Sequence, residues 1–185
     1  MRLVSSVMLP LNDSCVLSAN ILSVLIAAGA GQQLPQSFWD GLTQNTFTCP
    51  SNTAAYFRSL HNVPVYRYRY FGMFPNLEIP TSPGRAYHSS EILPMFGSSE
   101  GISKVDSTWQ ERMLGSYMRN AWATFAHCPS TGVERVFGWP RYSQATNGTE
   151  GLVLLGMNNN TGAQFSARGP HDGTCQLIAT GSPQG

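Results

Sequence analysis

An alternating pattern and a helical pattern dominate the middle of the chain. Residues 63–71 (VPVYRYRYF) alternate, with Tyr66, Tyr68 and Tyr70 on one face and Arg67 and Arg69 on the other, which predicts a strand. We interpret the two arginines as salt-bridged strand residues rather than as an anion site.

Apolar residues recur at helical spacing from about 108 to 127, which predicts an amphipathic helix. Ser107 and Gln110 fit a capping box at its start, and Pro129 ends it. The expected apolar stripe consists of Trp109, Met113, Tyr117, Ala121, Trp122 and Phe125.

Shorter elements flank these two. Pro35 opens a helix that reaches about Leu42, and Ser51 is the expected N-cap of a helix in NTAAYFRSLH. The segments LVLLG and AQFSA flank the turn-rich MNNNTG and predict a hairpin. The stretch 72–101 is rich in proline and glycine, and we expect a long functional loop there. The pattern as a whole predicts a mixed α/β fold.

Composition narrows the class of protein. Of the 185 residues only 11% are charged, and the net charge is +1, so there is no electrostatic footprint for a nucleic-acid partner or an anionic membrane surface. No run of 18 or more apolar residues occurs, so we expect no membrane span. The sequence indicates neither a metal, nor a cofactor, nor an oligomeric state.

The first 34 residues are atypical. Two apolar stretches, LVSSVMLPL and VLSANILSVLIAAGAG, resemble the hydrophobic part of a signal peptide, but polar Asn12, Asp13 and Ser14 interrupt them. A signal-like segment, a misassembled start, and a buried strand and helix all remain open for residues 1–34.

Cysteines and glycosylation sequons favour a secreted protein. The four cysteines lack the short spacing of a zinc or redox site; they are Cys15, Cys49, Cys128 and Cys175. The candidate glycosylation sites are Asn12, Asn147 and Asn159. Low charge, an even cysteine count and these sequons together favour an oxidising, extracellular setting.

Two candidate catalytic residues lie close together in residues 85–101 (RAYHSSEILPMFGSSEG). Ser99 completes a G-x-S-x-G pattern, but it lacks the leading strand and the immediate helix of a nucleophile elbow, and it follows the histidine instead of preceding it. His88 lies in the loop after the predicted strand, and an imidazole titrates near neutrality, so it can shuttle a proton. A surface histidine with a structural role is the simpler interpretation, and a metal site built on His88 and Glu91 finds no second cluster of ligands.

Three longer motifs occur in the order of a known family. FTCPSNTAAYFRSLHNVPVYRYRYFGMFPN, AYHSSEILPMFG and YMRNAWATFAHCPSTGV…GWPRY resemble the C-terminal part of type-B carboxylesterases, the secreted esterases and lipases that include the cholinesterases. The similarity extends over residues 38–175.

The resemblance implies a fold, a site and a disulfide. Residues 35–185 would form the C-terminal part of an α/β-hydrolase fold, with a few sheet strands and packed helices. His88 matches the triad histidine, and Cys49 matches a cysteine that the family joins to one near the C-terminus, here Cys175. The substrate in full-length relatives is a small-molecule ester or a lipid. Cys128 is then either free or paired with Cys15.

The departures from the family matter equally. Nothing in residues 1–84 resembles the serine elbow or the oxyanion-hole glycines, and Ala19 and Asn20 stand where the triad acid is expected. Because a triad histidine needs a hydroxyl and an orienting carboxylate, we expect the chain to be inactive alone. The alternative is a non-catalytic, secreted binding or adhesion module of the same fold.

Overall fold

The computed structural model describes residues 35–79, 84–143, 151–172 and 175, in two compact units. The first unit comprises residues 1–43, and its described part is helix α2 (Gln36–Thr43). The side chain of Gln36 donates a hydrogen bond to Asp40 one turn later, at 2.8 Å. The helix predicted after Pro35 is therefore confirmed, whereas residues 1–34 lie outside the described residues.

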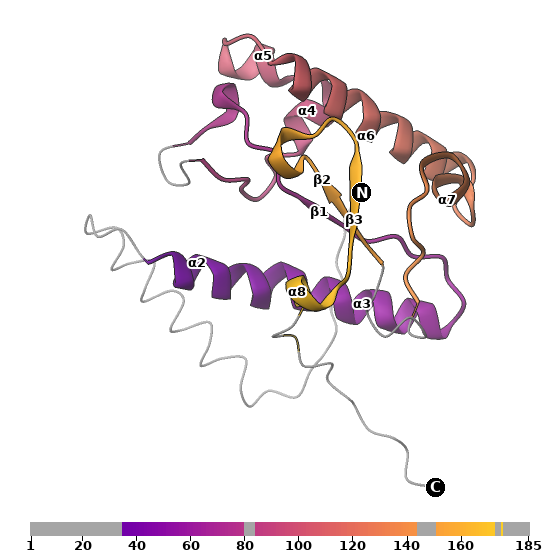
Figure 1. The fold of residues 1–185 in the computed structure, drawn as a ribbon. Coiled ribbons are helices and arrows are strands. Elements are labelled where there is room, and N and C mark those ends of the chain that lie inside the picture. The colour runs from indigo at the N-terminus through magenta and orange to yellow at the C-terminus, as the bar shows by residue number, and fades with distance from the viewer. Residues whose placement is uncertain (1–34, 80–83, 144–150, 173–174, 176–185) are drawn as a thin grey trace, which may run out of the picture. The chain divides into compact units, whose positions relative to one another are not determined.

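The second unit, residues 44–185, is mixed α/β and is organised around a three-stranded sheet. Its strands, in spatial order, are β1 (Tyr68–Tyr70), β2 (Leu152–Leu155) and β3 (Ala163–Ser166). Strands β1 and β2 are parallel and pair Tyr68 with Val153, whereas β2 and β3 are antiparallel. Figure 1 shows the helices of this unit and the sheet. The helical elements are η1 (Gln44–Thr48), α3 (Cys49–Leu60), η2 (Pro75–Leu77), α4 (Ile92–Phe96), α5 (Ser99–Ser103), α6 (Trp109–His127), α7 (Gly132–Phe137), η3 (Met157–Asn159) and α8 (Gly169–Asp172).

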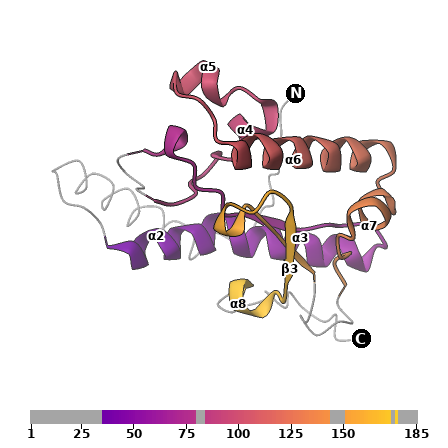
Figure 2. The same cartoon turned by 45° about the horizontal axis from the view of Figure 1, so that its top comes forward.

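Helices cover both faces of the sheet. Helix α6 lies on one face and α3 on the other in both ribbon views (Figures 1 and 2). All four residues of β2 are buried, as expected of a central strand with both faces covered. On the α6 side, Val153 and Leu155 join the core cluster that contains Leu114 and Met118, and these four side chains are fully shielded from solvent. The hydrophobic core therefore lies between the sheet and α6.

The strand predicted at 63–71 is confirmed at its C-terminal end only, because β1 has three residues. The alternation holds: the rings of Tyr66 and Tyr68 contact Phe125 and Trp122 of α6, whereas Arg67 points toward α3. Residues 63–67 are not ladder-paired throughout, although the carbonyl of Arg67 accepts a 2.9 Å hydrogen bond from Val153.

The predicted hairpin is confirmed as β2 and β3. Its link, 156–162, is tight because Asn158 and Asn159 both adopt positive φ, at 54° each, which asparagine tolerates better than most residues. The Asn159 amide then makes two hydrogen bonds to the main chain of Met73, donating at 2.8 Å and accepting at 2.9 Å. This pair of bonds fixes the loop after β1 to the hairpin link.

Helix α6 is confirmed, but its cap and its buried face differ from the prediction. Thr108, not Ser107, is the N-cap, and its hydroxyl accepts a 3.1 Å hydrogen bond from the amide of Glu111. The buried face runs through Glu111, Leu114, Gly115, Met118 and Ala121.

Close packing of α4 brings Gly115 into the buried face of α6. A Cβ at Gly115 would overlap the carbonyl oxygen of Pro94, so glycine is what allows α4 to approach α6. Of the predicted stripe, Ala121 lies in the core, and Tyr117 and Trp122 pack against it. Trp109 and Met113 are instead 63% and 44% exposed.

Helix α3 begins before the expected N-cap. Ser51 lies inside its first turn, because Pro50 occupies one of the first helical positions, where its missing N–H costs nothing. The stretch 72–101 is also not a plain loop: its described residues contain η2, α4 and the start of α5. The helix expected in NTAAYFRSLH is thus present with an earlier start.

Candidate functional site

His88 lies in a turn that leads from the loop after β1 into α4. Its side chain is exposed, and the next residue, Ser89, has a φ of 71°. Two hydrogen bonds between Tyr87 and Ser90 close the turn around His88. The amide of Tyr87 donates to the Ser90 hydroxyl at 3.2 Å, and the amide of Ser90 donates to the Tyr87 carbonyl at 3.0 Å. This backbone arrangement presents the imidazole at the surface rather than in the core.

The ring of Phe47 supports the imidazole of His88. The two rings are stacked, with centroids 4.6 Å apart and planes 24° from parallel. Phe47 belongs to η1 and is itself 44% exposed. The stacking engages a face of the imidazole, while the His88 side chain as a whole stays exposed.

Within the part of the chain that the structure describes, no hydrogen bond or ion pair joins His88 to a hydroxyl or a carboxylate. No hydrogen bond joins the imidazole to another described side chain, so the ring there has its stacking partner alone. A cavity of about 120 Å³ lies beside the turn, with Met73, Phe74, Leu77 and Tyr87 among its lining residues. It is smaller than the ~300–1,000 Å³ usual for ligand pockets.

Ser99 does not have the setting of a nucleophile. It is the first residue of α5, its side chain is 2% exposed, and its hydroxyl makes no hydrogen bond to any described group. A nucleophilic serine needs a base within hydrogen-bond reach. The G-x-S-x-G match is therefore accidental, as its sequence context indicates.

The structure joins Cys49 and Cys175 in the disulfide that the family resemblance implies, with the Cα atoms 5.1 Å apart. The bridge ties the start of α3 to the segment after α8. Cys128 is a free, exposed cysteine, and hydrogen bonding with Thr131 lowers its pKa. Cys15 lies outside the described residues.

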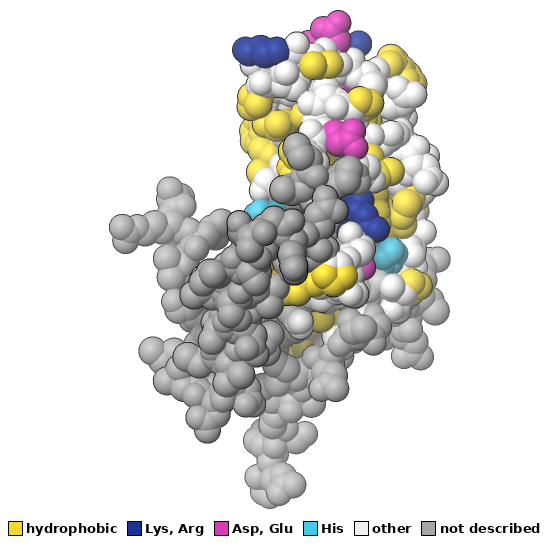
Figure 3. Space-filling view, turned by 90° about the vertical axis from the view of Figure 1, so that its left-hand side faces the viewer, with side chains coloured by type: hydrophobic (Ala, Val, Ile, Leu, Met, Phe, Trp, Pro, Cys, Tyr) yellow, Lys and Arg dark blue, Asp and Glu magenta, His cyan; other side chains and the backbone are white. Residues whose placement is uncertain are grey.

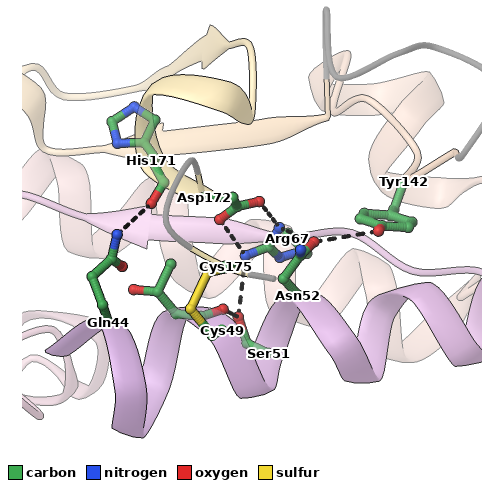
Figure 4. The surroundings of a disulfide bond; sticks show 10 residues. Gln44, Cys49, Ser51, Asn52, Arg67, Tyr142, His171, Asp172 and Cys175 are labelled. Atoms are coloured by element: carbon green, nitrogen blue, oxygen red, sulfur yellow. Dashed lines mark hydrogen bonds and ion pairs between the residues drawn. A yellow bond between two sulfur atoms is a disulfide. The ribbon is translucent and has the colours of Figure 1, made fainter. Parts of the chain in front are cut away.

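A buried polar network surrounds this disulfide (Figure 4). Arg67 makes two hydrogen bonds to the carboxylate of Asp172, at 2.6 and 3.1 Å, and one to the amide oxygen of Asn52, at 3.0 Å. Arg67 and Asp172 are 8% and 9% exposed. The hydroxyl of Tyr142 donates to the same Asn52 oxygen at 3.3 Å, and Ser51 accepts from Arg67 at 3.2 Å. The predicted salt bridge is confirmed for Arg67.

Arg69, the other strand arginine, has no ion pair with a described residue. Its guanidinium lies 5.4 Å from the ring centroid of Phe71. Burial, and secondarily the charge of Arg69, lowers the pKa of the nearby His171. The surface formed by Arg69 and His171 is therefore neutral to cationic. The two residues do not form an arrangement like a catalytic triad.

Replacement of Asp172 by alanine is expected to destabilise the protein by about 3 kcal/mol, because it leaves the Arg67 guanidinium buried without its counter-charge. Urea unfolding of the variant and the wild type measures the difference. Glu100→Ala is the matched control: the Glu100–Arg112 pair is exposed, and its loss is expected to change stability far less than the loss of Asp172. Equal losses in both variants would contradict the structural role assigned to the buried pair.

Two of the predicted glycosylation sites, Asn12 and Asn147, lie outside the described residues. Asn159 is half-buried, and its amide nitrogen already donates to the carbonyl of Met73. A glycan on that nitrogen would have to coexist with this bond, so modification at Asn159 stays a prediction.

Other site types find little support in the described ranges. No group of three or more His, Cys, Asp or Glu side chains there is arranged to hold a metal ion. Within the same ranges, every helix is too short or too polar to traverse a lipid bilayer.

Sequence reasoning missed two parts of this region. Phe47, which stacks on His88, lies far from it in the sequence, and no sequence pattern marks Phe47 as a partner of His88. The second part is the group of Asn52, Tyr142 and Asp172 around Arg67, whose members lie far apart in the sequence. Only the prediction of a salt-bridged strand arginine pointed to this group.

Comparison with characterised proteins gives consistent matches. The chain is 32% identical over 129 residues to secreted lipase 5 of Gibberella zeae, a match that covers 70% of this chain and 23% of the lipase. It is 28% identical over 120 residues to the chlorogenic acid esterase of Aspergillus niger, covering 57% and 23%. With the acylcarnitine hydrolase of Rattus norvegicus the identity is 33% over 97 residues, covering 51% and 17%.

The chain thus spans less than a quarter of the length of these relatives. No family model matches it, and no solved structure does either.

Proposed function

Because the chain is a distant homologue of the type-B carboxylesterases and lipases, we propose that it supplies the histidine of a carboxylic-ester hydrolase. Residues 35–185 would be the C-terminal part of an α/β-hydrolase fold, and residues 1–34 an atypical leading segment. The mixed α/β unit, with its histidine loop after a parallel strand, supports this assignment. The disulfide supports an oxidising, secreted setting.

The observation that carries the proposal is the presentation of His88. Its side chain is exposed, and its ring is stacked on that of Phe47. In the assembled enzyme the imidazole would take the proton from a serine hydroxyl as the oxygen attacks the carbonyl carbon of an ester. The imidazolium would then give that proton to the departing alcohol, leaving an acyl-serine. A water, deprotonated by the same imidazole, would release the acid and restore the serine.

The serine and the orienting carboxylate would come from polypeptide other than these 185 residues. The described residues place neither group beside His88, and Ser99 is buried without a partner. The substrate class proposed is a small-molecule ester or a lipid.

Complementation tests this function. The full chain would be co-expressed with the part of Gibberella zeae secreted lipase 5 that precedes the segment homologous to this chain; we call this part the lipase N-terminal part. We expect hydrolysis of short p-nitrophenyl esters by the co-purified pair and none above buffer by either component alone. Turnover by the chain alone would contradict the proposal.

A second function, binding without catalysis, is favoured by one observation: His88 has no hydrogen-bonding partner among the described residues. A co-purified pair that is stable but inert toward a panel of acyl chain lengths would support that function instead.

A further inference from the structure

The stack of Phe47 on His88 is a surface contact between two separate segments of the second unit. His88 is exposed and Phe47 is 44% exposed, and neither belongs to the core cluster. Figure 3 shows histidine and hydrophobic side chains together at the surface on one face of the molecule. Because core packing does not enclose the two rings, the geometry of the stack depends on the elements that carry them.

The backbone turn around His88 leaves the orientation of its imidazole to other contacts. The hydrogen bonds between Tyr87 and Ser90 fix the main chain on either side of it. Among the described residues the imidazole itself has the ring of Phe47 as its contact, 4.6 Å away between centroids. A stacked aromatic pair gains enough free energy to favour one orientation about two- to tenfold. The Phe47 ring therefore restrains the orientation of the imidazole.

Phe47 lies in η1, a single π-helical turn that directly precedes α3. A π-helical turn closes i→i+5 hydrogen bonds and so contains more residues than an α-helical turn, which takes its side chains out of the register of the helix that follows. Such turns are rare and recur at functional sites. The direction of the Phe47 ring thus depends on η1 keeping this geometry.

Both ends of η1 are attached to the segment around α8 (Figure 4). At its start, the side chain of Gln44 donates a 3.0 Å hydrogen bond to the carbonyl of His171. At its end, η1 is followed directly by Cys49, which forms the disulfide with Cys175. We call these two attachments, the Gln44–His171 hydrogen bond and the Cys49–Cys175 disulfide, the η1 clasp.

The η1 clasp is in turn attached to the sheet. Asp172 lies between the two clasp residues His171 and Cys175, and its carbonyl accepts a 2.7 Å hydrogen bond from the amide of Cys175. Its carboxylate makes the buried ion pair with Arg67. Arg67 immediately precedes β1, the strand from which the chain continues to the His88 turn. The two rings of the stack are therefore connected to the same buried pair.

We propose that Phe47 is a positioning residue for His88, and that the η1 clasp holds the Phe47 ring in place. This inference rests on the proposed function and extends it beyond the histidine itself. A proton carrier must be held in a narrow range of orientations, and a misplacement of about 1 Å can cost about 10²-fold in rate. The disulfide thus serves the site as well as the stability of the fold.

Proton NMR of the full chain alone tests the stack without any need for catalysis. At about pH 9, where an imidazole is ordinarily neutral, ring current should place the His88 Hε1 signal of the wild type upfield of its position in Phe47→Leu. Phe47→Tyr keeps an aromatic ring and should keep the upfield position. Phe57→Leu is the matched control, because Phe57 is 41% exposed in the neighbouring α3 and its ring contacts Tyr56. Circular dichroism verifies that the variants fold.

Two further variants test the η1 clasp by the same signal. Gln44→Ala removes the hydrogen bond to His171, and the double substitution Cys49→Ser and Cys175→Ser removes the disulfide. Each should move the His88 signal at least half of the way from its wild-type position to its position in Phe47→Leu. Cys128→Ser should leave the signal in place.

The fold of the double variant needs its own check, since loss of the disulfide is expected to destabilise the chain. The edge-to-face pair of Trp122 and Trp139, with centroids 5.7 Å apart on the α6 side of the sheet, provides one. Its upfield-shifted indole signals should persist in the folded variant. Gln44→Ala, which keeps the disulfide, decides the test if they do not persist.

Kinetics of the pair co-purified with the lipase N-terminal part separate positioning from substrate binding. Phe47→Leu should lower kcat for p-nitrophenyl esters about 10-fold and leave KM within about twofold, because a misplaced base slows the chemical step without weakening ester binding. Phe47→Tyr should restore kcat to within about threefold of the wild type. Phe57→Leu should change neither constant.

Several results would overturn the proposal. A His88 signal that is the same in the wild type and Phe47→Leu, or that moves equally in Phe57→Leu, would remove the positioning role. A rise in KM at constant kcat would make Phe47 a substrate contact instead. Unchanged signals in Gln44→Ala and in the folded double variant would remove the η1 clasp. A wild-type pair without turnover would contradict the proposed function alone, because the stack and the clasp are measured in the chain by itself.

Discussion

Replacement of His88 by alanine in the co-purified pair is expected to lower ester turnover by roughly 10⁴-fold or more, because the members of a catalytic triad act as a unit. Under the proposed function, the stacked, exposed imidazole of His88 would carry the proton in both half-reactions. Initial rates of p-nitrophenyl ester hydrolysis measure the loss. The apparent KM should change little, since the ring acts on the serine rather than on the ester.

His127→Ala is the matched control for His88→Ala. His127 lies in the last turn of α6 and is also exposed, so its loss should leave turnover within about twofold. Ser99→Ala should behave likewise, because the Ser99 hydroxyl is buried away from any base. A rate that is insensitive to His88, or one that depends on Ser99, contradicts the assignment.

Removal of the disulfide by the double substitution Cys49→Ser and Cys175→Ser should lower the free energy of unfolding by about 4–5 kcal/mol. The bridge spans 126 residues, and a loop of that length strongly restricts the unfolded chain. It also holds the segment that carries Asp172, whose carbonyl accepts a 2.7 Å hydrogen bond from the amide of Cys175. Loss of the bridge is therefore expected to loosen the Arg67–Asp172 pair as well.

Urea unfolding of the double variant, compared with Cys128→Ser, isolates this effect. Cys128 is free and exposed, so its substitution should leave the free energy of unfolding close to that of the wild type. A double variant that is less than about 1 kcal/mol less stable than wild type would show that the bridge does not hold the fold together.

The periodicity of the sequence predicted the two faces of β1 and the hairpin of β2 and β3. The alternation at 66–70 gives the correct faces of β1, because α6 and α3 lie on opposite sides of it. The hairpin of β2 and β3 also follows from its two apolar runs and the asparagine-rich link. In both cases the short-range pattern of residues was enough to predict the feature.

Features that depend on distant partners could not be predicted in the same way. The buried face of α6 includes Gly115 because α4 approaches there, a contact between segments that no local pattern relates. The start of α3 ahead of Ser51 has a local cause instead, because the adjacent Pro50 occupies one of the first helical positions. At the site, the family motif indicated His88, but its support by Phe47 depends on the placement of η1.

The central claim is that His88 serves a serine carried by another polypeptide, and a fluorophosphonate probe tests it most directly. Such a probe forms a stable ester only with a serine that a base has activated. Intact-mass analysis of the wild-type pair should place the probe on the lipase N-terminal part, only when this chain is present, and His88→Ala should abolish the labelling. Labelling of a serine in this chain without its partner, or labelling that persists without His88, would contradict the account.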